Sequence, residues 1–337
     1  MGEPEGMGRS KEGGDSGGRS AQRRPSRRLR IALLCAIPAL LLAGAAGAFW
    51  TGYRLYDQPF LWFNQNRIAA TADRAARWPE AATVVALGGT PLRHATLDEA
   101  AMSGLAARHG IAGLHFLRIV HDQAEFADFE PMLDAILRLA PDVLLLDLDL
   151  LFTERRTLVE VRRYAATLAG TLRNGTAYRS DQIALQYGKA CRPAAAGPAA
   201  SDAKEAESFD RQAVAWRDRV RFTPDPPAFE RVRRFADRAR AAGARVVLLH
   251  LHRPPALEER LHGPGGYPPA ALARLDGARG LPVWRFPDGL RRAAHHCADG
   301  TLGAEGRRAY SEWLASGIAE LLRRPPVEEA ALPPGRP

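Results

Sequence analysis

The chain has 337 residues, of which 46% are apolar, 7% are aromatic and only 3 are cysteines. At about 150 residues per domain, this length allows one large domain or two small ones with a sizeable core, which excludes a wholly disordered chain. Three cysteines exclude a disulfide-stapled miniprotein, and no spacing of Cys and His indicates a zinc site.

The formal net charge of +9 is unevenly distributed. Residues 1–30 carry eight basic and four acidic side chains, so this short segment supplies +4 of the total. It contains almost no apolar residues, which predicts a disordered tail. Elsewhere basic and acidic residues alternate, as in the segment 227–242, a pattern typical of solvated helix faces. The charge therefore does not indicate nucleic acid as a partner.

Residues 31–50, IALLCAIPALLLAGAAGAFW, contain no charged side chain. About 20 such residues are what a helix needs to cross about 30 Å of hydrocarbon. Arginines precede this segment and aromatic residues follow it, so the positive-inside rule places the tail in the cytoplasm and the rest outside. We expect a single-pass protein of a bacterial inner membrane, with the lipid bilayer as one partner and a periplasmic or otherwise extracytoplasmic main domain.

The alternative for this segment is a cleaved signal peptide. Small residues at 43–48 provide an A-x-A pattern for cleavage. Both interpretations export the remainder of the chain. Export would place Cys191 and Cys297 in an oxidising compartment, where these two cysteines are free to pair.

The exported part begins with an expected stalk at 51–81, which ends in a helix at 66–77. A single domain then covers 82–325, interrupted by an insertion at 174–225 and followed by a disordered tail at 326–337. Short apolar runs predict buried strands, and apolar residues at helical spacing predict helices between them. Strands are expected at 82–89, 143–148, 244–251 and 281–286, and helices at 97–109, 129–139, 152–172, 227–242 and 304–323.

Alternating buried strands and amphipathic helices predict an α/β three-layer sandwich with a mostly parallel sheet. In such sheets ligands bind beyond the carboxyl ends of the strands. The first strand ends in Gly88-Gly89-Thr90. A hydroxyl at a tight strand-to-helix turn is where α/β hydrolases place a nucleophile, although the methyl group of Thr makes its side chain stiffer than Ser. The alternative is that Thr90 only caps the helix or closes the turn.

This turn resembles the Gly-x-Ser turn of the SGNH/GDSL hydrolase superfamily, particularly its membrane-anchored members associated with O-acylation of envelope polysaccharides. The superfamily also ends in an Asp-x-x-His block followed by Leu and Gly and a last helix. Here Asp299, Leu302 and Gly306 resemble that block, but the His expected between Thr301 and Leu302 is absent.

The resemblance implies that Thr90 attacks an acyl carbonyl while the backbone N–H of Gly89 or Thr90 stabilises the oxyanion, with Gly88 and Gly89 as oxyanion or substrate-binding residues of the turn. It further implies that Asp299 orients a histidine that accepts the hydroxyl proton. His295 and His296 precede Asp299 and are the candidates for this base, the alternative being that both are solvated loop residues.

Other polar residues also follow predicted strands. Arg93 and His94 are candidates for recognising an anionic or sugar substrate, or are ordinary exposed residues of the first helical turn. Asp147 and Asp149 stand where the superfamily has a Gly-x-Asn-Asp block, and they can face the cleft, bind a cation or cap the next helix. His250 and His252 share a strand face and could join Asp149 around a metal, but no local spacing fixes a third ligand. We expect no metal and no cofactor.

Two functions remain open at this point. The first is an O-acyl esterase or acyltransferase that acts on cell-envelope polysaccharide through Thr90. The second is a catalytically inactive SGNH-like protein that binds an acylated glycan, or a multi-pass membrane acyltransferase, in the same cleft.

Overall fold

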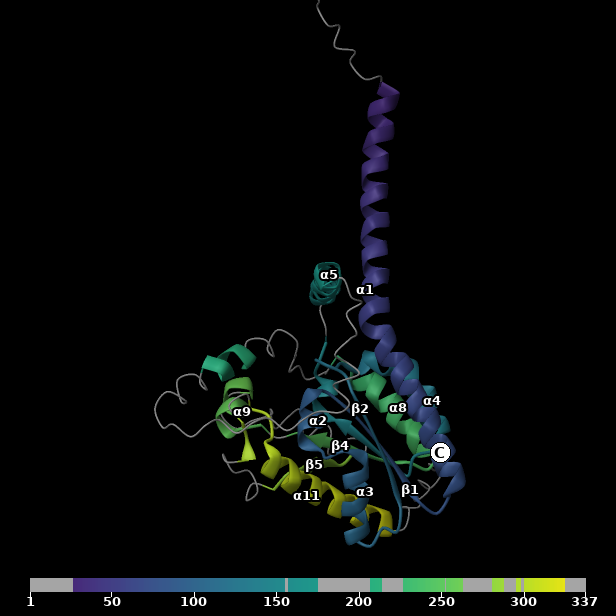
Figure 1. Cartoon of the computed structure of the whole chain (residues 1–337), viewed down its shortest axis with the longest axis vertical. Helices are drawn as coiled ribbons and strands as arrows, with labels where there is room; N and C mark the ends of the chain where they lie inside the picture. The colour runs from purple at the N-terminus through teal and green to yellow at the C-terminus, as the bar shows by residue number, and fades with distance from the viewer. Residues whose placement is uncertain are drawn as a thin grey trace, which may run out of the picture. The chain divides into compact units, whose positions relative to one another are not determined.

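The computed structural model describes residues 27–154, 157–174, 207–213, 227–251, 253–262, 281–287, 295–297 and 300–324. The chain falls into two units, Met1–Gly47 and Ala48–Pro337. Helix α1, Arg27–Arg77, begins in the first unit and ends in the second (Figure 1). By length and composition it could cross a membrane, and its most apolar stretch is not buried against protein.

The expected stalk at 51–81 is largely a continuation of α1, and its side chains enter the core. Phe60, Asn64, Ile68 and Thr71 are all buried. They recur at intervals of three or four residues, so they share one face of the helix. Asn64 Nδ2 donates to the carbonyl of Phe60 at 2.9 Å, which satisfies the buried amide locally. This part of α1 therefore belongs to the α/β unit itself.

Five parallel strands form the sheet, in the order β2-β1-β3-β4-β5. The predicted α/β class and parallel sheet are confirmed. Four strands lie within the predicted ranges, and β2, at the edge of the sheet, was not predicted. The strands are β1 Ala82–Gly88, β2 Leu114–Val120, β3 Val143–Asp147, β4 Arg245–His250 and β5 Val283–Arg285.

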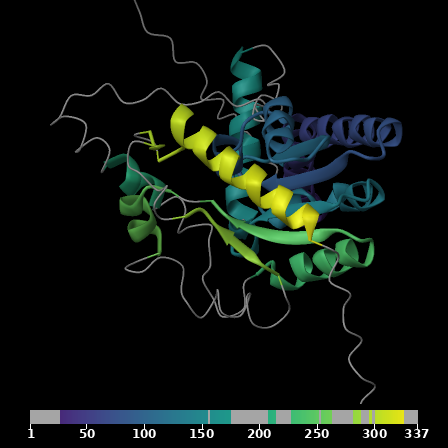
Figure 2. The ribbon, with the colours of Figure 1, turned by 90° about the horizontal axis from the view of Figure 1, so that it is seen from below.

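Alternate side chains of the strands supply two separate apolar clusters, one on each face of the sheet. Val85 and Leu87 of β1 belong to the cluster that includes buried residues of α4, Glu130–Arg138, and α8, Phe229–Ala241. Their neighbours Val84 and Ala86 belong to the cluster with α3 and α11. Helices thus cover both faces, with α11 and α8 on opposite sides (Figure 2). Helix α3 is Glu99–Arg108 and α11 is Ala304–Arg323.

The remaining elements connect the strands. Helix α2 follows β1, and short 3₁₀ helices lie between β2 and α4 and directly after β3. Within the expected insertion, only 207–213 is described, and it is helical with Phe209 buried. The tails expected at 1–30 and 326–337 lie almost wholly outside the described residues. The connecting elements are α2 Thr90–Ala95, the 3₁₀ helices Phe126–Asp128 and Leu148–Leu151, α5 Thr157–Asn174 and α9 Pro255–His262.

Candidate functional site

The carboxyl ends of the parallel strands bring together polar residues that are far apart in sequence. The chain runs from β1 outward to β2 and then returns to the other side of β1 to form β3. The order therefore reverses between β1 and β3, and open α/β sheets bind ligands at such a switch point. Thr90 follows β1, Asp122 follows β2 and Asp147 ends β3, so all three lie at this edge.

Thr90 is the first residue of α2, and Gly89 is the residue that caps this helix. The hydroxyl of Thr90 donates to Asp122 Oδ1 at 3.1 Å, and the side chain is only partly buried. The contact joins the ends of β1 and β2. Asp122 was not among the predicted site residues, because the strand before it was not predicted.

The two glycines allow β1 and β3 to approach closely at their ends. A Cβ atom on Gly88 would lie 2.8 Å from the Cβ of Asp147 and 3.0 Å from Cδ2 of Leu92, closer than side chains tolerate. The backbone N–H of Gly89 donates to Asp147 Oδ2 at 3.1 Å. This N–H, which an oxyanion would require, is therefore engaged by a carboxylate.

Asp147 is fully buried and links the turn to the following 3₁₀ helix. Its Oδ1 accepts the backbone N–H of Asp149 at 3.1 Å. Burial, together with the nearby charge of Asp149, raises the pKa of Asp147 to about 7, against the opposing effect of its two backbone hydrogen bonds and of Arg253. Burial likewise raises the pKa of Tyr310, and the charge of Asp147 adds to this shift. Within the described residues, the Tyr310 hydroxyl is buried without a hydrogen-bond partner.

Asp149, expected to face the substrate, forms an ion pair with Arg253 of the segment between β4 and α9. The backbone N–H of Arg253 donates to Glu258 Oε1 at 3.1 Å, and His250 Nε2 lies 3.7 Å from the same oxygen. Alternating acidic and basic groups thus run along the edge from β3 to β4. Across the part of the chain that is described, no group of three His, Cys, Asp or Glu side chains is arranged to hold a metal ion, and His252 lies outside that part.

Arg93 and His94 both lie in α2 and contact each other. Arg93 Nη2 is 2.8 Å from His94 Nε2, and the side chain of His94 is buried. Burial lowers the pKa of Arg93, while the charge of Asp122 acts in the opposite direction. Arg93 thus lies in the electrostatic field of Asp122, on the same short helix as Thr90.

Among the contacts of the described residues, none joins the predicted histidine bases to the predicted nucleophile. The carbonyl of the buried residue His295 accepts the N–H of Gly303 at 2.8 Å, and His296 pairs with Leu302 in an isolated antiparallel bridge. Neither histidine hydrogen-bonds to Thr90 among the described contacts, and Asp299 lies outside the described residues. Cys297, which directly follows His296, is disulfide-bonded. Cys191, its expected partner, is not among the described residues.

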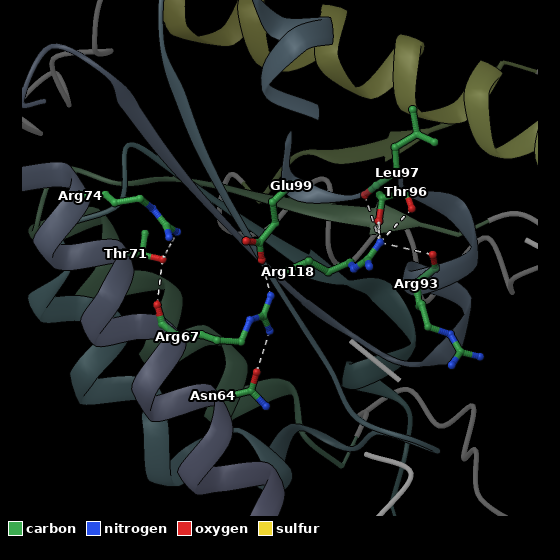
Figure 3. A network of polar contacts seen from close by, with 9 residues as sticks. All are labelled: Asn64, Arg67, Thr71, Arg74, Arg93, Thr96, Leu97, Glu99 and Arg118. Atoms are coloured by element: carbon green, nitrogen blue, oxygen red, sulfur yellow. Dashed lines mark hydrogen bonds and ion pairs between the residues drawn. The ribbon is translucent and has the colours of Figure 1, made fainter. Parts of the chain in front are cut away.

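A buried arginine holds the far end of α2. Arg118 of β2 donates through Nη1 to the carbonyls of Thr96 and Leu97 at 2.8 and 3.2 Å, and to Thr96 Oγ1 at 2.8 Å (Figure 3). Arg307 of α11 donates to the same Thr96 carbonyl at 2.6 Å. Burial, together with the neighbouring positive charge of Arg307, lowers the pKa of Arg118 to about 10. The arginine remains a cation at neutral pH.

A second polar pair lies beside this network. Arg67 of α1 is ion-paired with Glu99 of α3 and also donates to Asn64 Oδ1 at 2.8 Å (Figure 3). In the same view the guanidinium of Arg93 extends away from Arg118, although the Arg93 carbonyl accepts from Arg118 at 3.3 Å. Among the described contacts, the guanidinium of Arg93 thus contacts His94 and takes no part in the network around Arg118.

Comparison of the chain with protein-family models, with curated proteins and with solved structures found no match. The site must therefore be interpreted from its own geometry. The Thr90 hydroxyl and the Asp122 carboxylate lie at the switch point and are partly accessible. The ion pair of Asp149 and Arg253 and the buried carboxyl group of Asp147 lie at the same end of the sheet.

Proposed function

We propose that this protein is membrane-anchored and binds an acylated polysaccharide of the cell envelope at the carboxyl edge of its sheet, without hydrolysing it. The observation that favours binding over turnover is that the nucleophile and one of the two candidate oxyanion donors, the N–H of Gly89, are already engaged. The Thr90 hydroxyl donates to Asp122, and the Gly89 N–H donates to Asp147. A carboxylate is a weaker proton acceptor than imidazole, and an occupied N–H does not stabilise an oxyanion.

The polysaccharide assignment is supported by the resemblance of the Gly88-Gly89-Thr90 turn to the SGNH superfamily. Helices on both faces of a parallel sheet are compatible with the three-layer arrangement of that superfamily. Arg93 and the Asp149–Arg253 pair supply hydrogen-bonding groups suited to a ligand rich in hydroxyls. A multi-pass membrane acyltransferase is the proposed protein partner.

The proposed location is a bacterial inner membrane, with the α/β unit outside the cytoplasm. The apolar part of α1 and the arginines before it support this topology. The disulfide at Cys297 supports it independently, because cytoplasmic thiols are kept reduced.

The second candidate is an O-acyl esterase or acyltransferase with Thr90 as nucleophile. The observation in its favour is the position of Thr90, at the start of a helix and at the switch point of the sheet. In that function Asp122 would accept the hydroxyl proton, or Asp299 and a histidine would do so.

One experiment distinguishes the two functions. The full chain in lipid nanodiscs is titrated calorimetrically with fragments of an acetylated envelope polysaccharide and with the same fragments after chemical deacetylation, while released acetate is measured. We expect binding that prefers the acetylated form, no acetate release, and weaker binding by Thr90→Val. Ser103→Ala is the control, because the Ser103 hydroxyl donates to the carbonyl of Leu114, the first residue of β2, at the amino ends of the strands and away from the candidate site. Acetate release that Thr90→Val abolishes would establish the enzyme instead, and absence of binding would refute the proposal.

A further inference from the structure

Helix α5 buries several of its polar side chains and exposes several of its apolar ones. Tyr164 and Thr167 are buried, and the side chain of Arg163 is only 13% exposed. On the outer surface Val161 is 47% exposed and Leu172 is 76% exposed. A surface helix of a globular protein in water normally has the reverse arrangement.

The exposed apolar residues form one continuous stripe. Val161, Ala165, Ala169 and Leu172 are all exposed and recur at intervals of four, four and three residues, so they lie along one side of the helix. Arginines 162 and 173 are exposed as well and border this stripe. Burying a single Leu or Val side chain is worth about 1.5–3 kcal/mol, so the stripe favours an apolar environment.

The inner side of α5 is held by α1, at the last residues of the apolar span and the residues directly after it. A Cβ atom on Gly52 would overlap the Cβ of Tyr164, so the two backbones approach as closely as a glycine allows (Figure 1). The rings of Phe49 and Tyr164 are 5.0 Å apart, edge to face. Tyr164 also donates through its hydroxyl to Asp57.

Arg163 strengthens the same junction. Its guanidinium lies 4.3 Å from the centre of the Tyr56 ring and 3.6 Å from Asp57 Oδ1. Within the described residues, the buried nitrogens of Arg163 have this ion pair and this ring contact but no hydrogen-bond partner. The residues of α1 that α5 contacts include the aromatic group expected at a membrane–water boundary.

We propose that α5 lies in the outer headgroup region of the bilayer, with the stripe from Val161 to Leu172 in contact with acyl chains. The occupant is lipid because α5 packs against the segment of α1 that leaves the membrane. Interfacial helices of this kind bury an apolar face at the acyl boundary, while their arginines bind lipid phosphates. The inference rests on the proposed membrane anchoring, and it adds a second contact with the bilayer.

The test uses nitroxide labels on the full chain in nanodiscs of phosphatidylcholine and phosphatidylglycerol. Leu172→Cys and Val161→Cys are prepared in a Cys35→Ser background, because Cys35 is a free thiol. Collision of the label with oxygen, which partitions into lipid, is compared with collision with a water-soluble nickel chelate. We expect oxygen to dominate at both positions. Arg308→Cys, at an exposed site on α11, is the control at which the nickel chelate should dominate.

Three results would overturn the inference. Nickel accessibility at Leu172→Cys equal to that at Arg308→Cys would show that the stripe faces water. Low accessibility to both reagents would show that a protein, either a partner or a second copy, covers it. A label at Leu42→Cys, 72% exposed within the span, reports the anchor separately. If oxygen dominates there but not at position 172, only the role of α5 fails, and if it dominates at neither, the anchoring fails as well.

Discussion

Replacing the buried Asp147 by Asn should remove a large pH dependence from the stability of the protein. The pKa of this carboxyl group rises from 3.8 to about 7 on folding, because burial and the charge of Asp149 disfavour its ionised form. Between these two values the folded protein holds a proton that the unfolded chain has lost. The free energy of unfolding must therefore fall as the pH rises from about 4 to about 7.

The expected magnitude follows from the size of the shift. Each pKa unit corresponds to about 1.4 kcal/mol, so a shift of about 3 units lowers the stability of the wild-type protein by about 4 kcal/mol over the whole window. Asn carries no charge and contributes no such slope. Its single carbonyl oxygen can accept the N–H of Gly89 or of Asp149 but not both, which costs about 1–3 kcal/mol at any pH. About 1.7 kcal/mol of that loss has already occurred by pH 5, so between pH 5 and pH 8 the wild type should lose about 2.5 kcal/mol relative to Asp147→Asn, which should be the more stable protein at pH 8.

The assay is urea unfolding of the full chain in detergent, followed by tryptophan fluorescence from pH 5 to pH 8. Asp134→Asn is the matched control, since Asp134 is exposed and its pKa is lowered by a hydrogen bond and ion pair with Arg238, opposite in direction to Asp147. Its stability curve should not cross that of the wild type. Parallel curves for the wild type and Asp147→Asn would refute the argument, because they would show that Asp147 is ionised in the folded protein at all these pH values.

The other predictions concern packing and polar contacts, and each is checked by the same unfolding measurement. Gly88→Ala should lower the free energy of unfolding by about 1–3 kcal/mol, because the added methyl group overlaps its neighbours. Gly104→Ala, with open space around it in α3, should raise it by about 0.5–1 kcal/mol. Equal effects of the two substitutions would exclude a tight approach at Gly88. Arg118→Met should cost about 1–3 kcal/mol because it removes a donor from the Leu97 carbonyl and the Thr96 hydroxyl, although Arg307 still donates to the Thr96 carbonyl; Arg233→Met, by contrast, should change stability by less than about 0.5 kcal/mol. Tyr310→Phe should be neutral or slightly stabilising, since the buried hydroxyl makes no hydrogen bond to the described residues, and a large loss would reveal a partner for it.

The strands that the sequence predicts are those with an unbroken apolar run. β1, β3 and β4 are buried along almost their whole length, so every position selects for an apolar side chain. β2 escapes this pattern because its sequence, LHFLRIV, contains His115 and Arg118. Arg118 is tolerated there only because carbonyls from the loop after α2 bind it, and such a contact between distant segments leaves no local signal.

Because β2 was not predicted, Asp122 was not predicted as a site residue either. Once β2 is recognised, Asp122 stands two residues past its end, where a ligand residue would be sought. Arg253 stands three residues past the end of β4, a strand that was predicted, so its position after a strand could have been used to identify it. The Thr90 turn was predicted from its glycines alone. The pairing of Thr90 with a carboxylate was not, because sequence order does not reveal which strand lies beside which.

Helix α2 is fastened at both ends before any ligand arrives. Its first turn is held through Gly89 by Asp147, and the residue after its last turn is held by arginines 118 and 307. A segment restrained in this way loses little conformational entropy on complex formation. Association should then proceed at a rate set by diffusion and orientation, in a single kinetic phase without a slow rearrangement. Differences in affinity between ligands would accordingly be expressed in how long each remains bound.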